Sequence, residues 1–368
     1  MTAAAGAPVA VHQFIPALNP HDATGTHTLL VREALRSAGW RSEIFAEAIH
    51  DDLASSAHKH WAYPEHATPG DVAIYQFTTS SPVAGFLAER GLPLILDFHN
   101  FTGSEYFAGW EPGTAERAAR AEDELALLAP HALLGLAKST FSERVLHSAG
   151  CRVTAVVPVL ADYGRVTERP DPIVAAELAR LRSRGGADIL FVGRVVPSKA
   201  QHELVKALWT YRRLYDAEAR LHLVGGTSSF EYQKALMGFV RDLGLGEAVR
   251  LTGEVSDASL AAHYAAADVF LSLSAHEGFG VPLVEAMAAG VPVVARPAGA
   301  VAQTVYDAAL VLHAADPAYV AAALHRACTD QSLRTVLVEA GHRRAAALSD
   351  GAASRAFVDS VAGVVGRP

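Results

Sequence analysis

The chain has 368 residues, with 31 basic and 39 acidic side chains and a formal net charge of −8 when histidine is neutral. Such a chain lacks the basic face that displaces counterions from phosphates, which argues against a nucleic-acid binder. Hydrophobic residues make up 51% and charged residues 19%, a composition suited to packed cores rather than to a disordered polymer. At about 100–200 residues per domain, the length suggests two domains.

The cysteine positions and the lengths of the apolar segments argue against several classes of protein. Cys151 and Cys328 lie far apart in the sequence, so neither a disulfide framework nor a Cys-x-x-Cys metal site is available. The uncharged apolar stretch over residues 125–137 has 13 residues, whereas a membrane span needs about 18. The first residues also lack the positive charges that open a signal peptide. We expect a cytoplasmic protein without membrane insertion, and the sequence does not indicate its oligomeric state.

Short apolar runs alternate with helical stretches in the first half of the chain. Near-continuous runs of this kind predict strands buried on both faces of a parallel sheet. The predicted strands are residues 9–15, 72–77, 93–98, 132–136 and 153–157. Residues 26–38 predict a helix that stops at Gly39, and residues 116–128 predict a second one. We therefore predict a Rossmann-like, doubly wound domain over residues 1–165.

The apolar pattern lapses between residues 161 and 186 and then starts again. The second set of predicted strands is residues 189–192, 221–224, 249–252, 269–273, 291–295 and 310–312. This predicts a second Rossmann-like domain over residues 166–350, followed by a helix over residues 351–368 that could pack back on the first domain. The predicted fold class is α/β, with two doubly wound domains facing a cleft where ligands meet the carboxyl ends of the strands.

The densest pattern in the chain is His-Glu-Gly-Phe-Gly-Val-Pro-Leu-Val-Glu over residues 276–285. Glu277 lies in a Gly-containing turn after a predicted buried strand, and Glu285 lies inside the helix that follows. Free backbone amides at such a helix start attract an anion, and the two carboxylates suit sugar or ribose hydroxyls. The plain alternative is a turn whose glycines only serve the backbone, with a solvated pair of glutamates.

Glu277 and Glu285, with seven residues between them, resemble the E-x7-E signature of retaining GT-B glycosyltransferases, family 4 (glycosyl transferases group 1). Further segments are similar to the family in the same order. They are Phe191-Val-Gly-Arg-Val-Val-Pro-Ser-Lys199, Leu223-Val-Gly-Gly226, Thr252-Gly-Glu-Val255 and Ala267-Asp-Val-Phe270. The resemblance covers nearly the whole second domain, so chance is a poor explanation for it.

The resemblance implies a UDP- or GDP-type nucleotide-sugar donor held mostly by the second domain, and transfer with retention at the anomeric carbon. Arg194 and Lys199 would neutralise the leaving diphosphate. Glu285 would bind the ribose hydroxyls, and Glu277 would hydrogen-bond the donor sugar. The other implied donor-binding residues are Gly25, Val255, Gly278, Phe279, Gly280 and Val281. An ordinary solvated loop remains the alternative for the two cations.

Composition supports one of these roles independently. The chain has 26 arginines and five lysines, so a lysine at position 199 is unusual, and its ammonium is a compact charge suited to phosphate oxygens. Stabilising the charge that develops on the leaving diphosphate is the largest available catalytic effect. No Asp-x-Asp occurs in the chain, and we expect transfer without a metal or other cofactor. The resemblance implies that a departing phosphate oxygen helps to deprotonate the acceptor.

The first domain matches the family less sharply. Residues 19–25 occupy the place of a Gly-rich loop near the phosphates, but Gly25 is the only glycine there. His99 stands at the end of the predicted strand 93–98, where family members commonly have a histidine that would orient the sugar or donate a hydrogen bond. A lone histidine at a strand end is as often a packing residue.

Four residues are assigned to the acceptor side: Asp22, Phe101, Tyr106 and Trp110. The last three lie in the segment 101–110, which carries four aromatic residues and two glycines. This segment could stack on an acceptor ring or exclude water, since hydrolysis competes with transfer. A hydrophobic cluster beneath a loop is an equal alternative.

Charge divides unevenly between the two halves. Up to Arg165 there are 11 basic and 18 acidic residues, a balance of −7, which leaves −1 for the rest. An acidic first domain opposes docking on an anionic membrane, so we expect a soluble small-molecule or saccharide acceptor. The sequence thus predicts a hexosyltransferase acting on a hydroxyl. A non-catalytic nucleotide-sugar binding subunit and a GT-B sugar-nucleotide epimerase stay open as alternatives.

Overall fold

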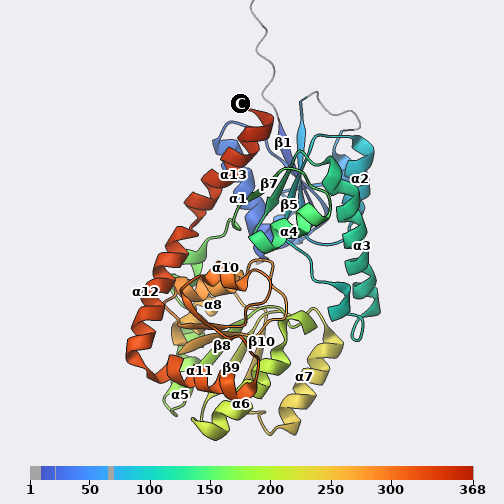
Figure 1. Cartoon of the computed structure of the whole chain (residues 1–368). Coiled ribbons are helices and arrows are strands. Elements are labelled where there is room, and N and C mark those ends of the chain that lie inside the picture. Colours follow the sequence, from blue (N-terminus) through green and yellow to red (C-terminus); the bar gives the residue numbers. More distant parts are fainter. Residues whose placement is uncertain (1–9, 21, 65–69, 368) are drawn as a thin grey trace, which may run out of the picture. The chain divides into compact units, whose positions relative to one another are not determined.

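The computed structural model describes residues 10–20, 22–64 and 70–367, and the chain divides into two compact units (Figure 1). Unit 1 comprises Met1–Ser104, Gly113–Ala161 and Ser349–Pro368, and unit 2 comprises Glu105–Pro112 and Asp162–Leu348. The sequence places residues 105–112 in the first domain, whereas the structure groups them with unit 2. No helix among the described residues is long and apolar enough to cross a membrane.

Unit 1 is built on a seven-stranded parallel sheet in the order β3-β2-β1-β4-β5-β6-β7. Its strands are β1 (Val11–Leu18), β2 (Ile44–Ile49), β3 (His58–Lys59), β4 (Val72–Phe77), β5 (Leu94–Phe98), β6 (Leu134–Ala137) and β7 (Thr154–Val156). The strand order reverses between β1 and β4, and ligands of such sheets bind beyond the carboxyl ends of the strands at this point. The sequence prediction missed β2 and β3.

Helices cover both faces of this sheet. They are α1 (Ala23–Ser37), α2 (Pro82–Arg90), α3 (Pro112–Leu128), α4 (Thr140–Ser148) and α13 (Asp350–Val365). Figure 1 shows α13, in red, beside α1, in blue. Phe357 and Val361 of α13 are fully buried in one core cluster with Val31 and Leu35 of α1. The end of the chain therefore contributes to the core of unit 1, as burial of these apolar side chains is favourable.

Unit 2 repeats the design with six parallel strands in the order β10-β9-β8-β11-β12-β13. The strands are β8 (Asp188–Val192), β9 (Arg220–Val224), β10 (Val249–Gly253), β11 (Val269–Ser272), β12 (Val293–Ala295) and β13 (Ala309–Val311). The helices are α5 (Pro172–Arg182), α6 (Gln201–Leu214), α7 (Phe230–Asp242), α8 (Asp257–Ala266), α9 (Val281–Ala288), α10 (Val301–Val305), α11 (Pro317–Thr329) and α12 (Gln331–Ala347). Here the order reverses between β8 and β11, which makes their carboxyl ends the expected ligand edge.

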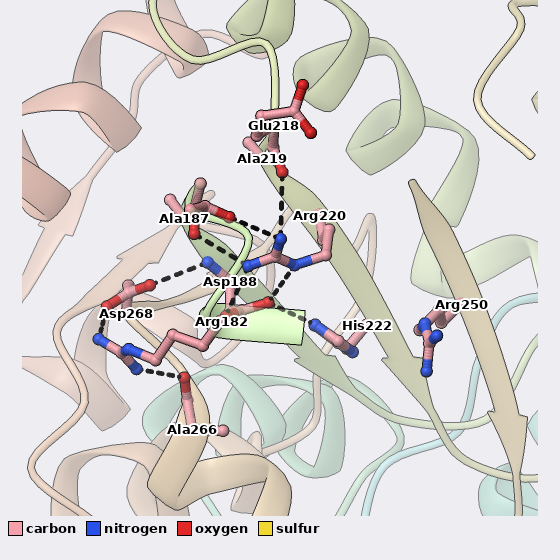
Figure 2. Close-up of polar contacts among 12 residues, drawn as sticks. Arg182, Ala187, Asp188, Glu218, Ala219, Arg220, His222, Arg250, Ala266 and Asp268 are labelled. Carbon is pink, nitrogen blue, oxygen red and sulfur yellow. Dashed lines mark hydrogen bonds and ion pairs between the residues drawn. The ribbon is translucent and has the colours of Figure 1, made fainter. Parts of the chain in front are cut away.

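A buried ion-pair network lies at the amino ends of β8 and β9. Figure 2 shows Arg220 and His222 both pointing at Asp188. The Arg220 Nε donates to Asp188 Oδ1 at 2.8 Å, and the His222 Nε2 lies 2.9 Å from the same oxygen. Burial acts to raise the pKa of Asp188, but hydrogen bonds from His222 and Arg220 lower it. This network ties the starts of β8 and β9 together, at the end of the sheet opposite the predicted site.

Candidate active site

Two loops at the carboxyl edge of unit 2 carry most of the predicted donor residues. One follows β8 and contains Arg194 and Lys199, and the other follows β11 and contains Glu277. The neighbouring strand ends pack very closely, since a Cβ on Gly225 would lie 2.3 Å from the Gly193 carbonyl oxygen. Only glycine fits there, which gives Gly225, the first residue after β9, a packing role.

Lys199 and Glu277 form an ion pair across these two loops. The Lys199 Nζ donates to Glu277 Oε1 at 2.6 Å, and the side chains are 21% and 13% exposed. The backbone joins the same loops, because the Ala275 amide donates to the Ser198 carbonyl at 2.8 Å. The Ala300 amide donates to the Glu277 carbonyl at 2.9 Å and holds the turn from the other side. Two residues predicted from separate motifs are thus brought into direct contact.

Arg194 lies in the same loop as Lys199, between β8 and α6, and is exposed. Its carbonyl accepts a hydrogen bond of 2.8 Å from Gln201 Nε2, at the start of α6. Within the part of the chain that the structure describes, its guanidinium makes no ion pair. Its charge is therefore available to an anion.

The start of α9 offers fewer free amides than the sequence suggests, because Pro282 has no N–H and the Leu283 amide donates to the Gly280 carbonyl at 3.0 Å. Gly280 caps α9 with φ +91°, a left-handed conformation that favours glycine, and offers no side-chain cap to the first turn. Phe279 is buried, and its carbonyl accepts from the Thr304 hydroxyl at 2.7 Å. Gly278 lies in the turn, and Val281 opens the helix. Val255 is half-buried just before α8.

Glu285 is a buried carboxylate among the predicted donor residues. Its side chain is 2% exposed, and Oε1 accepts from Arg165 at 2.7 Å and 3.1 Å. The Tyr264 hydroxyl donates to Oε2 at 3.0 Å, and burial raises the pKa of Tyr264 well above its usual value. Contact of Glu285 with ribose hydroxyls stays a prediction. Arg165 and Tyr264 were not predicted as its partners.

In unit 1, His99 follows β5 and is held by buried amides. Its Nε2 lies 2.7 Å from Gln76 Oε1, and Gln76 Nε2 donates to Gln13 Oε1 at 2.9 Å. Because the Gln76 amide donates to Gln13, its oxygen faces the imidazole and accepts the Nε2 proton of His99. Burial and the nearby Lys138 charge hold the pKa of His99 well below its usual value. A neutral imidazole at this strand end suits a hydrogen-bonding role.

A buried charge cluster lies next to His99. Asp97 pairs with Lys138, and both side chains are fully buried. The Leu160 amide donates to His27 Nδ1 at 2.9 Å, so the ring proton is on Nε2, which donates to Asp97 Oδ2 at 2.8 Å. Burial, helped by Lys138, lowers the pKa of His27 to about 4. Although burial acts to raise the pKa of Asp97, Lys138 and His27 lower it.

His27, Asp97 and His99 also offer three ligand atoms within 4.8 Å of one another, a spacing that could hold a metal ion. The Lys138 ammonium pairs with the same carboxylate and lies 3.2 Å from His27 Nε2. This ammonium already supplies the positive charge that a metal would bring. The residues therefore fit a lysine-compensated cluster better than a metal centre.

The remaining predicted residues fall in different places. A Cβ on Gly25 would lie 2.3 Å from the Asn19 carbonyl oxygen, so the β1–α1 turn needs glycine there. Asp22 caps α1, accepting from the Thr24 amide at 3.2 Å. Phe101 packs on the rings of Phe77 and Phe98 at 6.3 Å and 5.6 Å, as a hydrophobic cluster would. The structure separates these residues from Tyr106 and Trp110, which belong to unit 2.

Comparison with known proteins decides the family. The family model for glycosyl transferases group 1 matches residues 179–344, within unit 2. The D-inositol 3-phosphate glycosyltransferase of Kineococcus radiotolerans is 31% identical over 313 residues, which cover 78% of this chain and 70% of that relative. The chain belongs to the glycosyl transferases group 1 family. The family predicted from the E-x7-E signature is confirmed.

One further relative of this glycosyltransferase matches a shorter part of the chain, and two solved structures match most of it at lower sequence identity. The GDP-mannose-dependent alpha-(1-6)-phosphatidylinositol monomannoside mannosyltransferase of Mycobacterium tuberculosis is 40% identical over 146 residues, 37% of each chain. Anabaena Alr3699/HepE in complex with UDP and glucose has a TM-score of 0.76 at 19% identity, covering 96% of this chain and 100% of that one. The glycosyltransferase WaaG gives 0.69 at 15% identity, covering 93% and 98%. The predicted GT-B fold of two Rossmann-like domains is confirmed.

Proposed function

We propose that this glycosyltransferase is a retaining, family 4 enzyme that moves a hexose-type sugar from a UDP- or GDP-sugar to a hydroxyl acceptor. The observation that carries the proposal is the Lys199–Glu277 pair, formed between the loop that also carries the exposed Arg194 and the loop that leads into α9. Cations at this edge of the sheet suit a diphosphate, and the carboxylate suits sugar hydroxyls. The relatives' names, which mention GDP-mannose, support a nucleotide-sugar donor.

Donor binding would exchange partners at this pair. In the structure Lys199 donates to a carboxylate oxygen, and a diphosphate oxygen would take the place of that carboxylate. Glu277, released from Lys199, would then accept hydrogen bonds from the donor sugar. The same diphosphate would meet Arg194, so both cations would stabilise the negative charge that develops as the bond to phosphate breaks. Since these are protein cations, the proposed reaction needs neither a metal nor another cofactor.

The proposed transfer step balances without a protein nucleophile. The bond between the anomeric carbon and the phosphate oxygen breaks, and the acceptor oxygen forms its bond on the same face of the sugar. The acceptor proton passes to a departing phosphate oxygen, which becomes basic as the bond breaks. His99, neutral and held by Gln76, would hydrogen-bond the donor sugar and orient it.

The acceptor is proposed from the relatives and from charge. The names of two relatives contain inositol 3-phosphate and phosphatidylinositol monomannoside, which makes an inositol phosphate the first acceptor to test. The balance of −7 up to Arg165 favours the soluble compound over a lipid on an anionic surface. We propose that the reaction takes place in the cytoplasm.

Product stereochemistry tests this function. Purified protein is incubated with GDP-mannose or UDP-glucose and D-inositol 3-phosphate, with and without EDTA, and the product is followed by proton NMR. We expect an α-linked product from the α-linked donor, at a rate that EDTA leaves unchanged. A β-linked product would contradict retention, and loss of activity with EDTA would contradict metal independence. Isomerisation of the donor sugar would identify an epimerase, and binding without turnover a silent binding subunit.

A further inference from the structure

Residues Glu105–Pro112 interrupt unit 1 in sequence and belong to unit 2 in space. They therefore add a short element to the unit that carries the proposed donor site. Two aromatic side chains of this segment, Tyr106 and Trp110, contact unit 2 residues close to the Lys199 and Glu277 loops. Neither residue belongs to the motifs that the family resemblance covers.

Tyr106 contacts the loop that carries Glu277. Its hydroxyl donates to the Ala275 carbonyl at 3.3 Å, and its ring lies 6.3 Å from the ring of His276. The amide of Ala275 donates to the Ser198 carbonyl at 2.8 Å, one residue before Lys199. Tyr106 thus holds the residue through which the backbones of the two donor loops are joined.

Trp110 contacts Tyr232 of α7. Its ring meets the ring of Tyr232 edge-on at 5.2 Å, with an angle of 84° between the planes. Tyr232 is buried, and its hydroxyl accepts from the His202 amide at 3.2 Å, in the first turn of α6. That turn directly follows the Pro197–Lys199 turn, a 3-10 helix. Trp110 therefore supports, through Tyr232, the backbone that positions Lys199.

We infer that Tyr106 and Trp110 are positioning residues for the diphosphate-binding pair of Lys199 and Glu277. The inference rests on the proposed donor role of that pair. The two aromatics contact Ala275, His276 and Tyr232, and so act through the loops whose charges must meet the phosphates. Charged groups that are held in place before the substrate binds stabilise it without a cost of reorganisation, and small displacements of them are expensive. On this inference, segment 105–112 supports the donor-binding loops, whereas the sequence pattern suggested that it lies on the acceptor side.

The test is a calorimetric titration of the full chain with UDP, GDP, UMP and GMP. The dissociation constant of the nucleoside monophosphate, divided by that of the diphosphate, measures how much the second phosphate contributes to binding. If the aromatics only stabilised the fold, this ratio would not change. For the nucleotide that the wild type prefers, we expect Tyr106→Phe to lower this ratio about 3-fold, as the loss of one neutral hydrogen bond would. Trp110→Ala should lower it about 10-fold by removing an aromatic contact, and Trp110→Phe should restore most of it.

Matched controls are Tyr319→Phe on the exposed part of α11 and Trp61→Ala in unit 1, at 47% and 62% exposure. Both should leave the ratio unchanged. An unchanged ratio in Tyr106→Phe and Trp110→Ala, in a protein that binds the diphosphate, would overturn the inference and leave the proposed function standing. No diphosphate binding by the wild type would overturn both.

Discussion

Replacing Lys199 by methionine is expected to lower the turnover of the preferred nucleotide sugar about 10²–10³-fold, the usual cost of removing one group that stabilises developing charge. Methionine keeps much of the length of the side chain and removes only the ammonium. The effect should appear in kcat as well as in the KM for the donor, because charge on the leaving diphosphate is greater in the transition state than in the bound donor. The measurement is release of the nucleoside diphosphate under saturating donor.

Lys206→Met is the matched control for this substitution. Lys206 lies on α6, pairs with Glu203 at 2.9 Å and is 42% exposed, and an exposed pair of this kind is worth little. Its turnover should stay within about twofold of the wild type, since surface changes away from a site have small effects. Glu277→Gln should also lower the turnover. Its effect should not add to that of Lys199→Met, because the two residues act together. A Lys199→Met enzyme with wild-type turnover would refute the assigned role of this lysine.

Replacing Asp97 by asparagine is expected to lower the free energy of unfolding by about 3–5 kcal/mol, as removal of one partner from a buried ion pair does. The change is nearly isosteric, so it creates no cavity. It leaves the fully buried ammonium of Lys138 without its counter-charge, and it disturbs the acceptor of the His27 Nε2 proton. Denaturation by urea at pH 7, followed by calorimetry to separate the two units, measures the loss.

Two comparisons make this prediction specific. The double variant Asp97→Asn with Lys138→Met should be more stable than the sum of the single losses predicts, because it removes both charges. Asp330→Asn breaks an exposed pair with Arg326, whose side chains are 38% and 64% exposed, and should cost less than about 1 kcal/mol. If Asp97→Asn cost no more than Asp330→Asn, the buried cluster would have no structural importance.

The sequence predicted where Lys199 and Glu277 lie relative to the strands because their motifs are local. Lys199 and Glu277 each follow a buried strand, and both strand ends belong to the ligand edge of a parallel sheet. Their direct pairing at 2.6 Å depends on the strand order β8-β11, which no local pattern specifies. The strand β2 was missed for a local reason: Glu47 interrupts its apolar run, and half-buried strands lose the continuous pattern that identifies buried ones.

Other parts of the site depend on tertiary contacts that a sequence pattern does not carry. Arg165 lies in the stretch without periodicity, and only the fold brings it to Glu285. The sequence left open whether the rings of segment 101–110 stack on an acceptor, exclude water or form a hydrophobic cluster. It did not indicate the unit on which they pack, and the structure places Tyr106 and Trp110 in unit 2. The sequence also carried one indication of the buried charge cluster that the sequence analysis did not use. Lys138, a rare lysine in an arginine-rich chain, directly follows a buried strand, a position that only a partner such as Asp97 makes tolerable.

Unit 2 should bind a nucleoside-diphosphate sugar through Lys199, and isothermal titration of the full chain with UDP-glucose and GDP-mannose tests this most directly. We expect saturable binding of at least one donor to the wild type, and weaker binding of the same donor to Lys199→Met. At a donor concentration 100 times the dissociation constant, the folded protein should gain about 2.7 kcal/mol of stability. Failure of both donors, and of UDP and GDP themselves, to bind would contradict the donor site, as would equal binding to Lys199→Met.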